Sequence, residues 1–103
     1  MLFRSVKPAE IPTPQALVRV LEEAGIEYVF GMPGGDTGRI FDALYDSSAI
    51  QTVLVRHEQV GSIMAEMYGR LTGKPGVVMG QGIFLACNAL FGTLEAEIGR
   101  AHV

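Results

Sequence analysis

Three titratable residues, Arg56, His57 and Glu58, directly follow the apolar segment 53–55. That segment predicts a strand, and the residues after Glu58 predict a helix. Ligands in open α/β sheets bind at the carboxyl ends of the strands, so Glu58 is a candidate catalytic or binding residue. An acidic residue in the first turn of a helix also compensates the helix dipole, and position alone favours this simpler role.

The glycine-rich turn Gly31–Asp36 is similar in composition to nucleotide-binding loops, but its spacing differs from theirs. The pattern G-x-G-x-x-G is absent, and Pro33 lacks the N–H that a phosphate-binding loop would use. The segment Gly69–Pro75 is one residue shorter than a P-loop, and proline follows Lys74 where a P-loop has serine or threonine. These patterns argue against dinucleotide and P-loop binding.

Metal and nucleophile chemistry have little support in the sequence. His57 and His102 are isolated, and neither H-x-x-x-H nor C-x-x-C spacing occurs. The single cysteine, Cys87, excludes an internal disulfide framework and lies on an apolar helical pattern. We therefore expect ordinary polar histidines, no metal site in this chain, and a buried small hydrophobic residue at Cys87.

Helical and strand patterns alternate along the chain. Residues 1–13 lack periodicity and are interpreted as an N-terminal arm. The periodicity predicts helices over 14–24, around 40–45, over 60–71 and over 87–94, and strands over 27–31, 51–55 and 76–80. In the helix over 60–71, large apolar residues occupy one face, while Glu66 and Arg70 form an i,i+4 pair on the opposite face.

Strands that are continuous apolar runs between helices predict an α/β fold with a parallel sheet covered by helices on both faces. Three strands are few for such a sheet, so we expect the sheet to be truncated, with an open edge after the last strand. A chain of 103 residues allows one small domain at most.

Composition excludes several classes of function. The net charge is −3 and no run of Lys or Arg occurs, which argues against nucleic-acid binding. No apolar stretch is long enough to span a membrane, and the N-terminal residues lack the apolar core of a signal peptide. These features are typical of a cytoplasmic protein without a nucleic-acid or membrane partner.

Four segments together resemble a known enzyme family. They are Gly25–Gly35, Asp42–Asp46, Leu54–Gln59 and Tyr68–Val77, and they contain a V-F-G-x-P-G-G turn, an R-H-E-Q element and a Y-G-R-x-T-G-K-P-G-V element. In this order and spacing they are similar to the N-terminal pyrimidine-binding (PYR) domain of thiamine diphosphate-dependent enzymes of the acetolactate synthase type. The similarity extends from about residue 14 to 96 without gaps.

The resemblance implies the thiamine diphosphate-binding fold and assigns roles to four residues. Glu58 would be the catalytic glutamate, which hydrogen-bonds N1′ of the cofactor's aminopyrimidine ring and supplies a proton there, so that the 4′-amino group can remove the proton from thiazolium C2. Pro33 and Gly34 would form the turn beside the pyrimidine, and Asn88 would lie near the cofactor. Burial favours a protonated Glu58 and the helix start favours the anion, so the sequence leaves its charge state open.

The resemblance further implies a fragment, residues 14–97, of an enzyme that acts on 2-oxo acids as a carboligase or decarboxylase. Such enzymes are homo-oligomers with active sites between two chains, and Mg²⁺ holds the diphosphate in a later domain that this chain lacks. FAD is compatible with the family but nothing in the sequence indicates it. The alternative is a stand-alone α/β binding or interaction module without catalysis, which would need a complete sheet.

Two segments depart from the family. Residues 80–87 read G-Q-G-I-F-L-A-C, where the family usually has a T-S-G-P-G-A-T pattern, so the resemblance does not fix the substrate, and a divergent branch with another 2-oxo acid substrate is the alternative to acetolactate synthase activity. Residues 98–103, I-G-R-A-H-V, match the translation of a common sequencing-library adapter. We therefore expect 98–103 to be a non-native tail that forms no element of the core.

Overall fold

The computed structural model describes residues 11–101, which form eight elements in strict order along the chain. Helices and strands alternate up to the third strand, which confirms the predicted α/β fold. The elements are α1 (Thr13–Glu23), β1 (Tyr28–Gly31), α2 (Gly38–Tyr45), β2 (Gln51–Leu54), α3 (Glu58–Thr72), β3 (Val77–Met79), α4 (Gly82–Asn88) and α5 (Leu90–Ala101).

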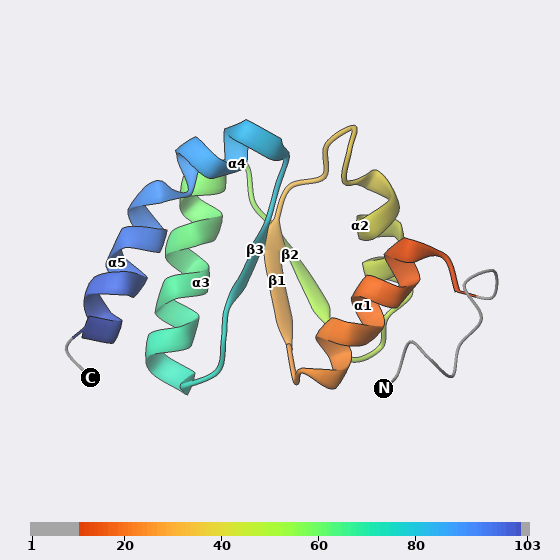
Figure 1. Ribbon diagram of the computed structural model, residues 1–103, viewed down its shortest axis with the longest axis horizontal. Helices are drawn as coiled ribbons and strands as arrows, with labels where there is room; N and C mark the ends of the chain where they lie inside the picture. The colour runs from red at the N-terminus through yellow and green to blue at the C-terminus, as the bar shows by residue number, and fades with distance from the viewer. Residues whose placement is uncertain (1–10, 102–103) are drawn as a thin grey trace.

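The sheet has the strand order β2-β1-β3, and both strand pairs are parallel, as predicted. Helices α1 and α2 cover one face, and α3, α4 and α5 lie on the other side (Figure 1). The chain leaves β1 across the first face and returns from β2 to β3 across the second. The carboxyl ends of β1 and β3 therefore flank a topological switch point, where ligands bind in folds of this kind.

The main hydrophobic core lies between the sheet and the α1–α2 layer. Val29 of the central strand is fully buried and Leu44 of α2 is 2% exposed. Burial of each such side chain contributes about 1.5–3 kcal/mol to folding. The remaining buried members of this core are Val18, Ile26, Ala43 and Ile50. This layer holds the central strand, and with it the carboxyl edge, in place.

Helix α3 packs through small side chains, which the sequence did not predict. The helix itself and the Glu66–Arg70 pair are confirmed, with Nε of Arg70 2.6 Å from Oε1 of Glu66. Its buried neutral residues, however, are Gly61, Ser62 and Ala65. The large apolar residues of α3, predicted to share one face, are exposed by 37% to 78%: Val60, Ile63, Met64, Met67 and Leu71.

Close contact between α3 and α5 explains why the small residues of α3 are buried and its large apolar residues are exposed. A Cβ atom added at Gly92 of α5 would lie 2.6 Å from the backbone carbonyl of Ser62 on α3. Helices approach this closely only where both present small residues, so the small face of α3 is enclosed between the sheet and α5. The larger side chains are left at its flanks.

The last predicted helix, over 87–94, was wrong in its extent. The chain instead forms two helices, α4 and α5, separated at the buried Ala89. Because α4 lies over the start of α3 and buries none of its residues, Cys87 is exposed and not buried as predicted (Figure 1). Helix α5 continues to Ala101 where no element was expected, while Ile98 is 52% exposed. The predictions for His102, Val103 and residues 1–10 lie outside the described residues.

Candidate functional site at the carboxyl edge of the sheet

The carboxyl ends of β1 and β3 lie in close contact. A Cβ atom added at Gly31, the last residue of β1, would lie 2.2 Å from the backbone oxygen of Met79, so only glycine fits here. The next residue continues the contact, since the N–H of Met32 donates to the same oxygen at 3.3 Å. The turns that follow the two strands therefore face each other across the switch point.

The turn after β1 is fixed by Thr37. The N–H of Gly34 donates to Oγ1 of Thr37 at 2.9 Å, and the N–H of Thr37 donates back to the oxygen of Gly34 at 3.2 Å. Thr37 is 9% exposed, so this pair is largely shielded from water. Pro33 is exposed beside it, and both predicted turn residues thus lie at the switch point.

Glu58 is the first residue of α3 and is only 7% exposed. Nδ2 of Asn88, at the end of α4, donates to Oε1 of Glu58 at 3.2 Å. On the other side, a Cβ atom added at Gly80 would lie 3.3 Å from Cγ of Glu58. The carboxyl group therefore lies between α4 and the turn that follows β3.

The pKa of Glu58 lies below its ordinary value, mainly because its own backbone N–H donates to the carboxylate. The hydrogen bond from Asn88 lowers the pKa further, and burial opposes both effects. Of the two opposing effects that the sequence left open, the helix start therefore outweighs burial. Glu58 is an anion at neutral pH in this state.

His57 has a structural role at the start of α3. Its Nδ1 accepts the N–H of Gln59 at 3.1 Å, which caps the helix. In the part of the chain that the structure describes, no three His, Cys, Asp or Glu side chains gather in a way that could hold a metal ion. Nor is any helix there long and apolar enough to cross a membrane.

The structure brings the predicted site residues to one edge, and Glu58 and Asn88 into direct contact. It also adds Gly80 and Gln81, which the sequence did not single out as site residues. A Cβ atom added at Gly34 would lie 2.5 Å from Oε1 of Gln81, so this side chain bridges the two turns. Gly80 and Gln81 directly follow a predicted strand, and this position could have indicated that they belong to the site.

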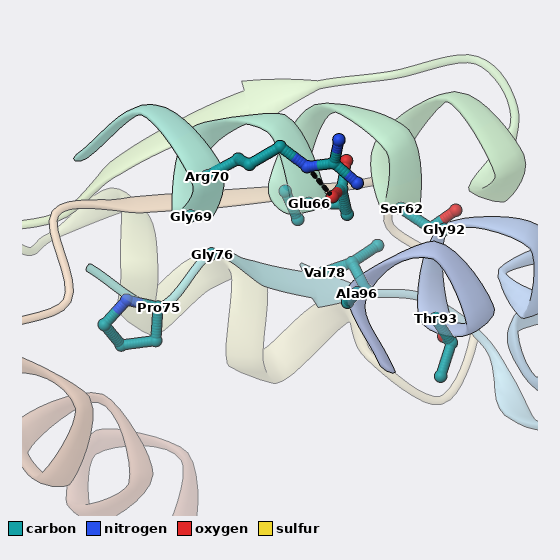
Figure 2. Close-up of a pocket in the computed structure, with 11 residues that line it drawn as sticks. Ser62, Glu66, Gly69, Arg70, Pro75, Gly76, Val78, Gly92, Thr93 and Ala96 are labelled. Atoms are coloured by element: carbon teal, nitrogen blue, oxygen red, sulfur yellow. Dashed lines mark hydrogen bonds and ion pairs between the residues drawn. The ribbon is translucent and has the colours of Figure 1, made fainter. Parts of the chain in front are cut away.

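A cavity of about 540 Å³ lies elsewhere, between α3, β3 and α5 (Figure 2). Small or apolar residues such as Ala65, Gly76 and Gly92 line much of it. Its charged groups, Glu66 and Arg70, are paired with each other. Since the charged side chains that line this cavity are paired with each other, we place the candidate site at Glu58, at the carboxyl edge of the sheet.

Comparison with known proteins shows the family of the chain. Residues 13–103 match the family described as thiamine pyrophosphate enzyme, N-terminal TPP binding domain. The acetolactate synthase large subunit of Haemophilus influenzae is 44% identical over 82 residues, which is 80% of this chain and 14% of that protein. The acetolactate synthase of Mycobacterium avium is 42% identical over 76 residues, 74% of this chain and 12% of that protein.

The chain thus spans a small part of the length of the curated relatives that it matches. The family match nevertheless covers every helix and strand that the structure describes. The chain therefore belongs to the thiamine pyrophosphate enzymes and corresponds to their N-terminal TPP-binding domain.

Proposed function

We propose that this chain provides the aminopyrimidine-binding half-site of a thiamine diphosphate-dependent enzyme that acts on 2-oxo acids, with Glu58 as its activating residue. The observation that carries the proposal is the environment of Glu58. It is a nearly buried carboxylate at the switch point, held by Asn88 and facing a turn that contains glycine. Such a group can exchange a proton with a ring nitrogen.

The residues at this edge fit an aromatic ring with nitrogen atoms on its rim. Gly34 and Gly80 leave the backbone of both turns open to close approach, with the side chain of Gln81 against Gly34, and Pro33 offers an apolar surface beside them. Neither Asn88 nor Gly80, which lie against Glu58, carries a carboxyl group, so Glu58 provides the acidic group at this point. When bound, thiamine diphosphate supplies a nucleophilic carbon and an electron sink for the cleavage or ligation of 2-oxo acids.

The low pKa of Glu58 has a consequence for this role. The carboxylate is charged before the ring binds, whereas the activating residue must carry a proton at the pyrimidine N1′. A ring packed over Glu58 displaces water, which disfavours the charged form and raises the pKa toward that of N1′. Asn88 holds the carboxylate in place without adding charge.

The remainder of the enzyme is also part of the proposal. Because relatives named acetolactate synthase are far longer than this chain, we propose that further domains bind the diphosphate through Mg²⁺ and that the whole protein is a homo-oligomeric carboligase or decarboxylase. The cytoplasmic location remains a prediction from the sequence. Residues 80–87 differ from the family's usual pattern, which supports a 2-oxo acid substrate other than that of acetolactate synthase.

The proposal can be tested in a chimaera in which residues 13–97 replace the corresponding segment of the Haemophilus influenzae large subunit. Hydrogen–deuterium exchange at C2 of bound thiamine diphosphate, followed by NMR, reports cofactor activation directly. Glu58→Gln should slow this exchange by about 10²–10⁴-fold, the range expected for loss of a general acid–base group. Glu23→Gln, at an exposed position on α1, is the matched control. Unchanged exchange in Glu58→Gln would refute the role.

A further inference from the structure

The inner face of α4 consists of two residues. Leu85 and Asn88 are half-buried, whereas the other five residues of this seven-residue helix are exposed. The two lie three positions apart and therefore share one face of the helix. This face is turned toward the start of α3, since Asn88 donates to the carboxylate of Glu58 at 3.2 Å. Helix α4 thus presents one apolar and one polar side chain to the start of α3.

Leu85 lies against Gly80, at the same point as Glu58. A Cβ atom added at Gly80 would lie 3.2 Å from Cδ1 and 3.3 Å from Cβ of Leu85, and 3.3 Å from Cγ of Glu58. Because Gly80 has no side chain, both neighbours can approach the backbone that follows β3. Cγ is the carbon next to the carboxyl group, so the apolar side chain of Leu85 helps to shield a residue that is only 7% exposed.

The two residues of this face have opposite effects on the charge of Glu58. Its own backbone N–H and then Asn88 lower the pKa of the carboxyl group, whereas burial raises the pKa. Leu85 contributes to burial, because an apolar side chain excludes water and offers no hydrogen bond to an anion. Asn88 therefore stabilises the charged form of Glu58, and Leu85 favours the neutral form.

Among the described residues, few other charged groups face Glu58. His57 directly precedes it and lowers its pKa less than the amide of α4 does. The strands β1 and β3 end in uncharged residues, and α4 carries one titratable group, the exposed Cys87. On α5, Glu95 lies 3.7 Å from Arg70, about three turns along α3 from the carboxylate. Uncharged contacts with α4 and with the turn after β3 therefore dominate this environment.

We propose that Leu85 is a positioning residue of the half-site, which covers the stem of Glu58 with apolar surface and so prepares this carboxyl group to take up the proton that it shares with the pyrimidine N1′. This inference rests on the proposed function and adds a residue that acts through Glu58 and not on the ring itself. Without the apolar cover, the carboxylate would keep more of its water and stay charged when the ring binds. The proposal also gives a physical role to one of the bulky residues that replace the family's Gly-Pro-Gly turn.

The test compares two substitutions at Leu85. Leu85→Asn keeps the approximate size of the side chain but makes it polar, whereas Leu85→Met keeps it apolar and changes its shape. Carboxyl ¹³C shifts of Glu58, followed against pH in the full chain, should give a lower pKa in Leu85→Asn and the wild-type pKa in Leu85→Met. Leu71→Asn, the same change at a 78% exposed position on α3, is the matched control. Circular dichroism checks the fold of each variant, and if the chain does not fold alone, the chimaera described above is titrated instead.

Exchange at C2 of thiamine diphosphate in that chimaera links this environment to cofactor activation. Leu85→Asn should slow the exchange at neutral pH about tenfold, a part of the roughly 10²–10⁴-fold that an acid–base group contributes. It should also shift the pH dependence of the exchange toward acid, because the proton on Glu58 is then lost at lower pH. Leu85→Met should do neither.

The two substitutions and Glu58→Gln separate the possible outcomes. If Leu85→Met changes the pKa and the exchange as much as Leu85→Asn does, or if neither has an effect, the apolar character of Leu85 is not what matters and the inference is wrong. If Glu58→Gln slows the exchange but Leu85→Asn does not, the role of Leu85 is wrong and the half-site stands. If Glu58→Gln leaves the exchange unchanged, the proposed function fails and the role of Leu85 fails with it.

Discussion

The side chain of Asn88 donates to the carboxylate of Glu58 across 30 residues of sequence, with Nδ2 and Oε1 3.2 Å apart. The bond joins the end of α4 to the start of α3, two helices that meet at the carboxyl edge of the sheet. Because a donor to a carboxylate stabilises the charged form, Asn88 on α4 adds to the backbone N–H of Glu58 in lowering the pKa of that carboxyl group.

Removal of this donor should raise the pKa of Glu58. Asn88→Ala leaves the backbone N–H of Glu58 as the main group that lowers the pKa, so the rise should be partial. Asn88→Asp places a second carboxylate beside the first and should raise the pKa further, because like charges disfavour ionisation. Carboxyl ¹³C chemical shifts of Glu58, followed against pH, measure the effect. A pKa that is unchanged in both variants would show that the bond has no electrostatic role; Gln59→Ala is the exposed control.

The same carboxylate makes stability depend on pH. Its pKa in the folded state lies below the ordinary value of 4.5, so the unfolded chain binds the proton more readily. The stabilisation is complete above pH 4.5 and is lost as the pH falls through the lower folded pKa. The difference in unfolding free energy between the wild type and Glu58→Gln should therefore shrink on acidification from about pH 7 to about pH 3, measured by urea denaturation. A difference that grew in acid would have the wrong sign.

The strands and the candidate site could be predicted because their signals are local. Val53–Val55 and Val77–Met79 are short apolar runs between helices, and such runs are typical of the buried strands of a parallel sheet. Parallel pairing then brings the residues after each strand to one edge. This is why Glu58 and the Pro33–Gly34 turn could be placed together before the structure was known.

The features that the sequence did not predict depend on contacts between distant segments. The inward face of α3 is set by Gly92, some 30 residues further along the chain, and not by the apolar pattern of α3 itself. Cys87 follows a helical apolar pattern, yet the short α4 contacts its neighbours without burying any of its own residues. Likewise, Gln81 became a candidate only when its side chain was seen against Gly34.

The contact between α3 and α5 should be sensitive to a single methyl group. In Gly92→Ala the new Cβ would lie 2.5 Å from Oγ and 2.6 Å from the backbone carbonyl of Ser62, so α5 must shift away from α3. Overpacking of this kind costs about 1–3 kcal/mol of unfolding free energy. Gly38→Ala at the start of α2 is the matched control, since nothing lies within 4 Å of its Cβ, and it should stabilise the fold by about 0.4–1 kcal/mol. Equal stability of the two variants in thermal unfolding would contradict the close packing.

The outer surface of α3, α4 and α5 should cause the chain to self-associate when it is expressed alone. Eleven of the fifteen exposed large hydrophobic residues in the described part of the chain lie on these three helices, and Phe91 and Leu94 of α5 are 54% and 53% exposed. An apolar surface of this extent is rarely left in contact with water. Replacing Phe91 by Lys should therefore shift the chain toward the monomer, because burying the new charge in an interface would be costly. Tyr45→Lys is the matched control: Tyr45 is 89% exposed but lies on α2, on the other side of the sheet. Sedimentation velocity over a range of concentrations distinguishes the variants, and a wild-type chain that stays monomeric at high concentration would show that this surface needs no partner.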